Sequence, residues 1–355
     1  MWFKNLVGFD EVSPKYVRDN LFLEGNKMTS KLNGKSFQFG TLAIPSLKEL
    51  KQTSQKDSIK GSISVREVIG NVQELHCDSK NKHALFQAAS QFNLLEMVSP
   101  QITPEHGVAI YDRDYTQGPA CAIACGAGTI YRNYFAPINN QIGQSSSHQI
   151  DCLELIGKEL GNENSNLWEM VNGYALLNLE GLTSINSQIE QLNSEQREQL
   201  KECLKIGIQW DTEVTISDPT QIVSQVYCSA LPVSYSQVET AYCEGFARLI
   251  LEATYEATFH AALLNYQKTG SNKVFLTLVG GGAFGNKLDW ITESIFVAVS
   301  KFMNTPLDIV IVSYNASKKE VIELIEKINS VKYLPTKNKW LNPKDNFGKL
   351  KRGTE

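Results

Sequence analysis

Two continuous apolar segments near the C-terminal end of the chain constrain the fold more than any other feature of the sequence. Residues 274–279 read Val-Phe-Leu-Thr-Leu-Val, and residues 307–312 read Leu-Asp-Ile-Val-Ile-Val. Strands of this composition have both faces covered, which predicts a sheet lying between two layers of helices. A helical pattern at residues 290–303 joins the segments, so we expect a strand–helix–strand unit with parallel strands and an α/β fold.

Other segments extend this pattern. We expect further strands at residues 37–42, 84–89, 108–111 and 222–230. A capping box, Ser236-Gln-Val-Glu239, predicts the start of a long helix that ends before Gly270. Residues 160–215 are polar and rich in Asn, Gln and Glu, and we interpret them as an insertion between strands with one amphipathic helix near residues 194–205.

The composition limits the class of protein. With 42% apolar residues in a chain of 355 and a formal net charge of -4, the chain can bury a core but lacks the positive field of a general nucleic-acid binder. No apolar run approaches the ~18 residues of a membrane helix, and the N-terminus lacks the apolar segment of a signal peptide. Seven scattered cysteines without a Cys-x-x-Cys pair indicate a reducing compartment and no zinc site. We therefore expect a cytoplasmic protein without a nucleic-acid or membrane partner.

A glycine-rich loop follows the first apolar segment, where residues 280–287 read Gly-Gly-Gly-Ala-Phe-Gly-Asn-Lys. Such a loop between a strand and a helix exposes backbone N–H groups that suit a phosphate or diphosphate. The loop satisfies Gly-x-Gly-x-x-Gly, but no acidic residue ends the next strand, so we reject a Rossmann site. A P-loop is rejected because Asn286 and Leu288 stand where it requires a lysine and a hydroxyl residue. A tight turn without a ligand is the remaining alternative.

The loop and its neighbours resemble a known family. Residues 278–286, Leu-Val-Gly-Gly-Gly-Ala-Phe-Gly-Asn, are similar to the diphosphate-binding loop of macrodomains, specifically of the branch that includes poly(ADP-ribose) glycohydrolases. Residues 226–232 resemble the strand before that family's long helix, residues 86–93 its strand and turn at the distal ribose, and residues 309–314 its final strand. The order of the pieces also agrees. The chain further resembles a subgroup with an ADP-ribosyl hydrolase effector of Legionella.

This resemblance implies a three-layer α/β/α macrodomain-like fold with a mixed sheet and an ADP-ribose cleft at the carboxyl ends of the strands. In that family, backbone N–H groups of the glycine loop hold the diphosphate and an aromatic side chain flanks the adenine. The residues implied for ADP-ribose here are Asn71, Asn93, Gly280, Gly281, Gly282, Ala283, Phe284, Gly285, Tyr314 and Asn315. Asn71 stands where many macrodomains have an aspartate for the adenine amine, and its carbonyl could still accept that hydrogen bond.

The paired glutamates of the glycohydrolase signature are absent, so that catalytic route does not carry over. Cleavage of a glycosidic bond at the distal ribose still needs carboxyl groups that protonate the leaving group, stabilise positive charge or orient water. The segment 96–118 supplies four candidate catalytic acids, Glu96, Glu105, Asp112 and Asp114. If Tyr111 ended a strand, Asp112 and Asp114 would project to the same side just beyond it. Solvated or helix-capping acids are the alternative.

The sequence divides into three parts on this interpretation. Residues 1–63 form an N-terminal extension, residues 64–316 a macrodomain-like domain with the insertion at about 160–215, and residues 317–355 a C-terminal helix with a basic tail. The basic tail, residues 331–355, is interpreted as solvated chain or as a docking surface.

Three functions remain open. The first is an enzyme that hydrolyses ADP-ribose from an ADP-ribosylated protein. The second is a reader that binds ADP-ribose or ADP-ribosylated protein without cleaving it, and the third is a scaffold with a vestigial cleft. No cofactor and no metal site is expected, although acids beside a diphosphate could hold Mg²⁺. If the Legionella resemblance holds, the protein acts as an effector in the host cytosol.

Overall fold

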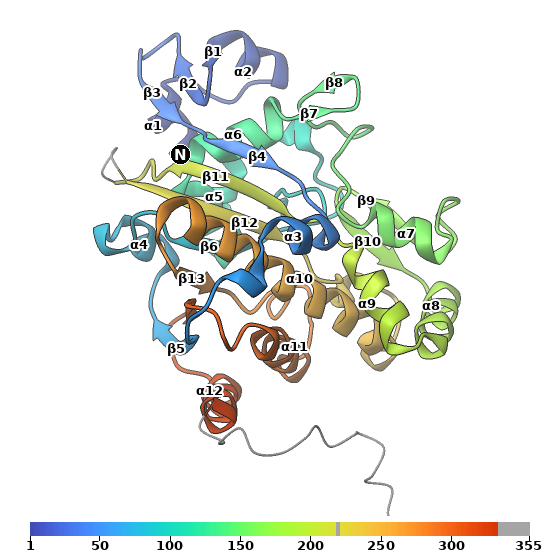
Figure 1. Cartoon of the computed structure of the whole chain (residues 1–355). Helices are drawn as coiled ribbons and strands as arrows, with labels where there is room; N and C mark the ends of the chain where they lie inside the picture. The colour runs from blue at the N-terminus through green and yellow to red at the C-terminus, as the bar shows by residue number, and fades with distance from the viewer. Residues whose placement is uncertain (218–220, 333–355) are drawn as a thin grey trace, which may run out of the picture.

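The computed structural model describes residues 1–217 and 221–332 and is built around a seven-stranded mixed sheet (Figure 1). The strand order is β4-β11-β12-β6-β13-β14-β5. The bounds are Thr41–Ala43 (β4), Ser64–Ile69 (β5), Leu85–Ala89 (β6), Gly207–Glu213 (β11), Ile222–Cys228 (β12), Lys273–Leu276 (β13) and Asp308–Ser313 (β14). From β12 to β5 all neighbouring strands are parallel, whereas β11 is antiparallel to both β12 and β4.

Helices cover both faces of this sheet. On one face α10 packs across β6, β12 and β13, with α11 beside it and α12 beside α11, and α4, α5 and α6 cover the other face (Figure 1). The bounds are Val72–Cys77 (α4), Gln117–Ala124 (α5), Gly126–Tyr134 (α6), Thr240–Thr269 (α10), Leu288–Lys301 (α11) and Lys319–Lys332 (α12). The expected three-layer α/β/α class with a mixed sheet is confirmed.

Smaller elements surround the three layers. Strands β1, β2 and β3 form a separate antiparallel sheet near the N-terminus, and β9–β10 and β7–β8 are hairpins. Their bounds are Trp2–Val7 (α1), Pro14–Asn20 (α2), Leu21–Glu24 (β1), Lys27–Ser30 (β2), Ser36–Gln38 (β3), Leu47–Thr53 (α3), Pro137–Ile138 (β7), Gln141–Ile142 (β8), Glu154–Leu160 (α7), Trp168–Val171 (β9), Tyr174–Leu177 (β10), Leu179–Gln191 (α8) and Ser194–Glu202 (α9). Short 3-10 helices are Lys56–Ser58 (η1), Ser79–Asn81 (η2), Pro104–His106 (η3), Ala109–Arg113 (η4) and Val233–Tyr235 (η5).

The two apolar segments form the expected strand–helix–strand unit. Strands β13 and β14 are parallel neighbours joined by α11, and Ile309, Val310 and Ile311 are fully buried. In β13, Phe275 lies opposite Phe86 of β6, and the two rings stack with centroids 4.4 Å apart. Apolar side chains on both faces of these strands therefore meet the helix layers, as their composition predicts.

The strand expected at residues 108–111 is wrong. This segment enters η4, a 3-10 helix that begins at Ala109, and Val108 before it and Tyr111 within it both belong to a buried apolar cluster. The N–H groups of Val108 and Ala109 are bound by the Glu11 carboxylate rather than by a neighbouring strand. A four-residue apolar run cannot by itself distinguish these outcomes, because both a strand and a helical turn can bury it.

Three other expectations need correction. The strand at residues 37–42 is interrupted at Gly40 (φ 79°), so that β3 and β4 belong to different sheets. The helix α10 does end before Gly270, at Thr269, but it begins at Thr240, and Ser236 instead closes η5 by donating its N–H to Val233 O. Residues 207–213, within the segment interpreted as an insertion, are β11 of the central sheet.

The N-terminal segment has its own apolar cluster. Phe3, Val7 and Phe9 pack with Tyr111 and with α5 and α6, and Leu95 and Met97 belong to the same cluster. The segment assigned to an extension thus shares a buried cluster with both residues that flank Glu96, and it also supplies β4 to the central sheet. The division of the chain at residues 63 and 316 stays a prediction. Of the basic tail, residues 333–355 lie outside the described residues.

Candidate active site

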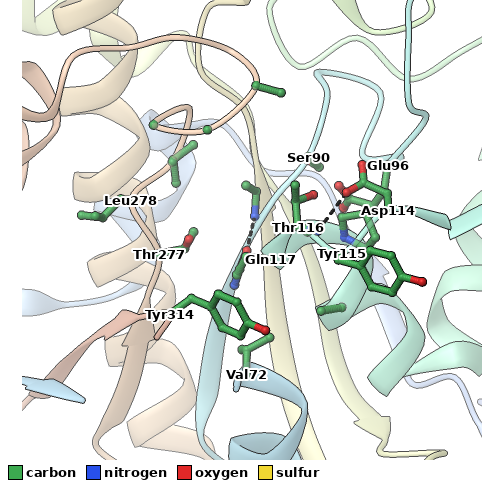
Figure 2. A pocket seen from close by; sticks show the side chains of 18 of the residues that line it. Val72, Ser90, Glu96, Asp114, Tyr115, Thr116, Gln117, Thr277, Leu278 and Tyr314 are labelled. Carbon is green, nitrogen blue, oxygen red and sulfur yellow. Dashed lines mark hydrogen bonds between the residues drawn. The ribbon is translucent and has the colours of Figure 1, made fainter. Parts of the chain in front are cut away.

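A cleft of about 770 Å³ lies at the carboxyl ends of the parallel strands. The loops that follow β5, β6, β12, β13 and β14 all contribute to its walls. In open α/β sheets this edge is where ligands bind, because the loops there diverge around the ends of the strands. In Figure 2, Glu96, Asp114 and Tyr115 lie on one side of the cleft, and Tyr314, Thr277 and Leu278 lie on the other.

The glycine loop forms the middle of the cleft wall. Gly280 has φ 76°, and a Cβ there would lie 2.5 Å from the Ala230 Cβ. Gly285 has φ 72°, and a Cβ there would overlap the Ser234 hydroxyl. Both positions therefore require glycine for conformational and for steric reasons. Asn286 fixes the loop, since its Nδ2 donates to Leu231 O at 2.8 Å and its N–H to Gly280 O at 2.9 Å.

The central part of the loop presents backbone donors to the cleft. Gly282 and Ala283 are exposed, and the N–H groups of Gly282, Ala283 and Phe284 have no acceptor among the residues that the structure describes. Successive backbone N–H groups of this kind form an anion-binding concavity. Gly281 also lines the cleft, whereas Gly285 does not and instead closes the turn by donating to Gly282 O.

An aromatic cluster supports the side chain of Phe284. Its ring lies 5.4 Å from that of Tyr174 and 5.8 Å from that of Tyr235, and these two rings are 5.0 Å apart. Tyr174 comes from hairpin β9–β10 and Tyr235 from η5. All three line the cleft, so segments distant in the sequence hold the loop from outside the sheet.

At the end of β14, Tyr314 is 68% exposed and lines the cleft. The Glu67 carboxylate holds the loop that carries it, because Ser313, Ser317 and the Lys318 N–H all donate to it. Asn315 is exposed in a left-handed conformation (φ 64°) and does not line the cleft.

Asn71 lines the cleft at the start of α4, and its side-chain carbonyl already accepts one hydrogen bond. Its Oδ1 accepts the N–H of Gln73 at 2.9 Å and thereby caps the helix. A carbonyl oxygen has two lone pairs, so the hydrogen bond expected from an adenine amine to this oxygen stays a prediction, and the Asn71 Nδ2 group is a further donor for a ligand.

Glu96 is the most unusual acid of the cleft. It lines the cleft, yet it is only 3% exposed, and its Oε1 has no hydrogen-bond partner among the described residues. Burial raises the pKa of Glu96 well above its usual value, with Asp114 adding to the increase and Arg132 opposing it. A Cβ at Gly118 would overlap the Glu96 carboxyl group, so glycine there makes room for it.

Asp112 and Asp114 reach the cleft from η4. Asp112 is the fourth residue of that helix, and Asp114 follows its last residue. The Asp114 Oδ1 accepts the Thr116 N–H at 2.8 Å, which is a dashed line in Figure 2. Both side chains are partly exposed, so they meet solvent where Glu96 does not. The shared direction that a strand would have given them does not apply.

The structure does not bring Glu105 or Asn93 into the cleft. Glu105 accepts the N–H and the hydroxyl of Ser146 at 2.8 and 3.1 Å. Asn93 is fully buried, donates to Gln149 Oε1 at 2.8 Å and accepts the Leu95 N–H at 3.1 Å. Asn93 therefore shapes the turn that leads to Glu96 without facing the cleft.

Sequence reasoning missed several residues that line the cleft. They are Trp2, Ser90, Gln91, Tyr115, Thr116, Gln117, Tyr174, Tyr235, Thr277 and Lys318. Tyr115, Thr116 and Gln117 directly follow Asp114, and their position beside a candidate acid was a usable signal. Trp2 and Tyr174 carried no such signal, because they come from the segments assigned to an extension and to an insertion.

Two further absences concern the described residues alone. In residues 1–217 and 221–332, no three His, Cys, Asp or Glu side chains gather as a group that could hold a metal ion. Over the same two ranges, every helix is too short or too polar to cross a membrane.

Comparison with known proteins gives similarity of structure only. No protein-family model matches the chain, and no curated protein matches it. Poly(ADP-ribose) glycohydrolase from Deinococcus radiodurans, solved in complex with ADP-ribose, superposes over 82% of this chain and 95% of its own at 8% identity (TM-score 0.43). The enzyme from Thermomonospora curvata, bound to the inhibitor ADP-HPD, does so over 88% and 97% at 10% identity (TM-score 0.43). The resemblance to the Legionella subgroup stays a prediction.

Proposed function

We propose that the protein binds ADP-ribose in this cleft and hydrolyses the glycosidic bond that joins the distal ribose to a modified protein. The observation that carries the proposal is Glu96, a buried carboxyl group with a free oxygen, placed with Asp114 at the end of a cleft whose wall presents free backbone N–H groups. A buried carboxyl group with a raised pKa is the usual form of a general acid.

The cleft suits the parts of ADP-ribose in order. The N–H groups of Gly282, Ala283 and Phe284 would bind the diphosphate, as the resemblance of the loop implies. Tyr314 would stack on the adenine, and Asn71 would donate to its edge through Nδ2. The distal ribose would then lie towards Glu96 and Asp114, which occupy the other side of the cleft (Figure 2). A volume of about 770 Å³ is within the range of pockets that enclose a ligand of this kind.

The buried Glu96 and the partly exposed Asp114 would have different roles in the hydrolysis. Glu96 would give its proton to the atom of the modified side chain that leaves C1 of the ribose. Asp114 would stabilise the positive charge that develops on the ribose and take a proton from the attacking water. The products are ADP-ribose with a new hydroxyl at C1 and the restored protein side chain, and water is the only co-reactant. Asp112 also lines the cleft and is a second candidate for the group that takes this proton.

The first experiment is calorimetric titration with ADP-ribose, with ADP, AMP and NAD as comparators. We expect binding that is selective for ADP-ribose, followed by release of ADP-ribose from modified proteins by the wild type. Turnover should fall by at least about 100-fold in Glu96→Gln and Asp114→Asn, while both variants retain binding. Absence of heat and of thermal stabilisation with every ligand would refute the proposal.

A reader of ADP-ribosylated protein is the second candidate. The observation that favours it is the 3% exposure of Glu96, because an acid enclosed by the protein contacts substrate only if the cleft rearranges. Binding of ADP-ribose without turnover of any ADP-ribosylated protein would support the reader and exclude hydrolysis.

A further inference from the structure

The N-terminal segment reaches the candidate site through one carboxylate. Glu11 lies between α1 and α2, and its oxygens accept the N–H of Val108 at 2.9 Å and of Ala109 at 2.6 Å. The Tyr134 hydroxyl donates to the same carboxylate at 2.6 Å. Gly107 has φ 84°, and a Cβ there would overlap the Glu11 carboxylate. The chain before η4 is thus shaped around Glu11.

These two N–H groups belong to the start of η4. The first N–H groups of a helix have no acceptor within it, so another group must satisfy them. Val108 is the N-cap of η4, and its own side chain is apolar and cannot do so. A carboxylate in this place both accepts the hydrogen bonds and interacts favourably with the positive end of the helix.

The rest of η4 makes hydrogen bonds to the two candidate acids, Glu96 and Asp114. Tyr111, the third residue of η4, accepts the Glu96 N–H on its hydroxyl at 2.9 Å. Asp114 follows η4 and donates its N–H to Tyr111 O at 3.2 Å. One short helix therefore fixes Glu96 and Asp114 relative to each other, and Glu11 holds the start of that helix.

We propose that Glu11 is a positioning residue of the hydrolytic site, which acts through η4 on Glu96 and Asp114. The inference rests on the proposed function and deepens it. On this inference the N-terminal segment is needed for the geometry of the active site. Trp2 of the same segment also lines the cleft, and it donates its Nε1–H to Val108 O at 3.3 Å. Glu11 itself is absent from the cleft wall.

The test is Glu11→Gln in the full-length protein. Glutamine keeps the shape but places an N–H₂ group against one of the two backbone N–H groups, so one hydrogen bond is lost. Ser30→Ala is the matched control, because it removes a buried 2.6 Å hydrogen bond to Val7 O in the same N-terminal segment without touching η4. We expect Glu11→Gln to lower kcat by about tenfold or more, since small displacements of acids are costly. The Kd for ADP-ribose should change by less than about twofold, because the glycine loop and Tyr314 are untouched.

Amide hydrogen exchange supplies a readout that needs no activity. Exchange over residues 108–116 should accelerate in Glu11→Gln and stay at the wild-type rate in Ser30→Ala. The inference is overturned by unchanged exchange, by an unchanged kcat, or by an equal loss of kcat in Ser30→Ala. A wild type that cleaves no ADP-ribosylated protein refutes the proposed hydrolysis instead, and the exchange rates alone then decide whether Glu11 holds η4.

A second variant covers a failure of Glu11→Gln to fold. Tyr111→Phe removes only the hydroxyl that accepts the Glu96 N–H and keeps the buried ring. It should lower kcat with little change in the Kd for ADP-ribose. An unchanged kcat in this variant would break the proposed route from Glu11 to Glu96.

Discussion

Gln91 and Met97 are joined by two hydrogen bonds that close the turn carrying Glu96. The Met97 N–H donates to Gln91 Oε1 at 2.8 Å, and Gln91 Nε2 donates to Met97 O at 3.1 Å. The Tyr174 hydroxyl donates to the same Met97 oxygen at 2.7 Å. Two sets of hydrogen bonds therefore hold Glu96. Gln91 and Tyr174 bind the neighbouring Met97, and the Tyr111 hydroxyl accepts the N–H of Glu96.

Replacing Gln91 should affect stability and turnover together. Gln91→Leu leaves the Met97 N–H buried without an acceptor, so we expect the free energy of unfolding to fall by about 1–3 kcal/mol. We also expect kcat to fall, because Glu96 loses one of its supports. Urea unfolding and steady-state kinetics would measure both. Gln188→Leu, which removes hydrogen bonds from Nε2 to Leu160 O at 3.3 Å and to the Ser184 hydroxyl at 3.4 Å, should leave kcat unchanged.

The raised pKa of Glu96 gives stability a definite pH dependence. The folded protein keeps a proton that the unfolded chain releases near pH 4.3, so the free energy of unfolding should fall as the pH rises from there towards the folded pKa. Glu96→Gln should remove this slope and be more stable than the wild type at neutral pH. Urea unfolding at a series of pH values from about 5 to about 8 measures this pH dependence in both proteins. Parallel curves for both proteins would contradict a protonated Glu96.

The same proton predicts the pH dependence of turnover. If Glu96 is the general acid, kcat should fall at alkaline pH as the carboxyl group ionises. Asp114→Asn should lower kcat without abolishing this alkaline limb, because Glu96 remains. A rate that rises through the alkaline range would exclude Glu96 as the proton donor.

Two alanine substitutions in the glycine loop should differ sharply. Gly285→Ala forces a side chain into a left-handed conformation and into the Ser234 hydroxyl. We expect this variant to lose about 1–3 kcal/mol in the free energy of unfolding. We also expect it to bind ADP-ribose more weakly than the wild type. At Gly282 a Cβ meets nothing within 4 Å, so Gly282→Ala should unfold like the wild type. Thermal unfolding and calorimetry compare the pair, and equal melting temperatures would refute the steric argument.

A buried ionic cluster joins α3, α9, α10 and α11 away from the cleft. Lys201 is fully buried and lies 2.5 Å from Glu198, 3.4 Å from Glu252 and 3.5 Å from Glu256. Lys301 also contacts Glu198 and Glu256, at 2.7 and 2.6 Å. Lys201→Met should cost about 3–5 kcal/mol, because it leaves buried carboxylates with too few cations. Lys158→Met, which breaks an exposed pair with Glu154, should leave the free energy of unfolding close to that of the wild type.

This cluster should also make the protein sensitive to acid. Burial raises the pKa of Glu198, but hydrogen bonds from Lys201 and Lys301 outweigh it and lower the pKa to about 2. A depressed folded pKa contributes stability that is present above the unfolded value of about 4.3 and is lost as the pH falls towards 2. Glu198→Gln should flatten the acid limb of the unfolding curve, whereas Glu195→Gln on the same helix should not.

The sequence by itself determined the parts of the protein whose signal is local. The apolar segments of β13 and β14 require burial on both faces, and the helix between them requires parallel strands. Because the loop after β13 then lies at the carboxyl edge of the sheet, the sequence also located the glycine loop, with Gly280 and Gly282 in the cleft wall and Tyr314 near it.

Only the tertiary structure decided the acid end of the cleft. Residues 109–113 form a 3-10 helix rather than a strand, and Glu11, about a hundred residues earlier, accepts the N–H groups at its start. Glu96 is buried, and this burial raises the pKa of its carboxyl group, whereas Glu105 is bound elsewhere by Ser146. An acid's environment is set by groups that fold against it from distant segments, so its sequence neighbours do not reveal which acid enters the site.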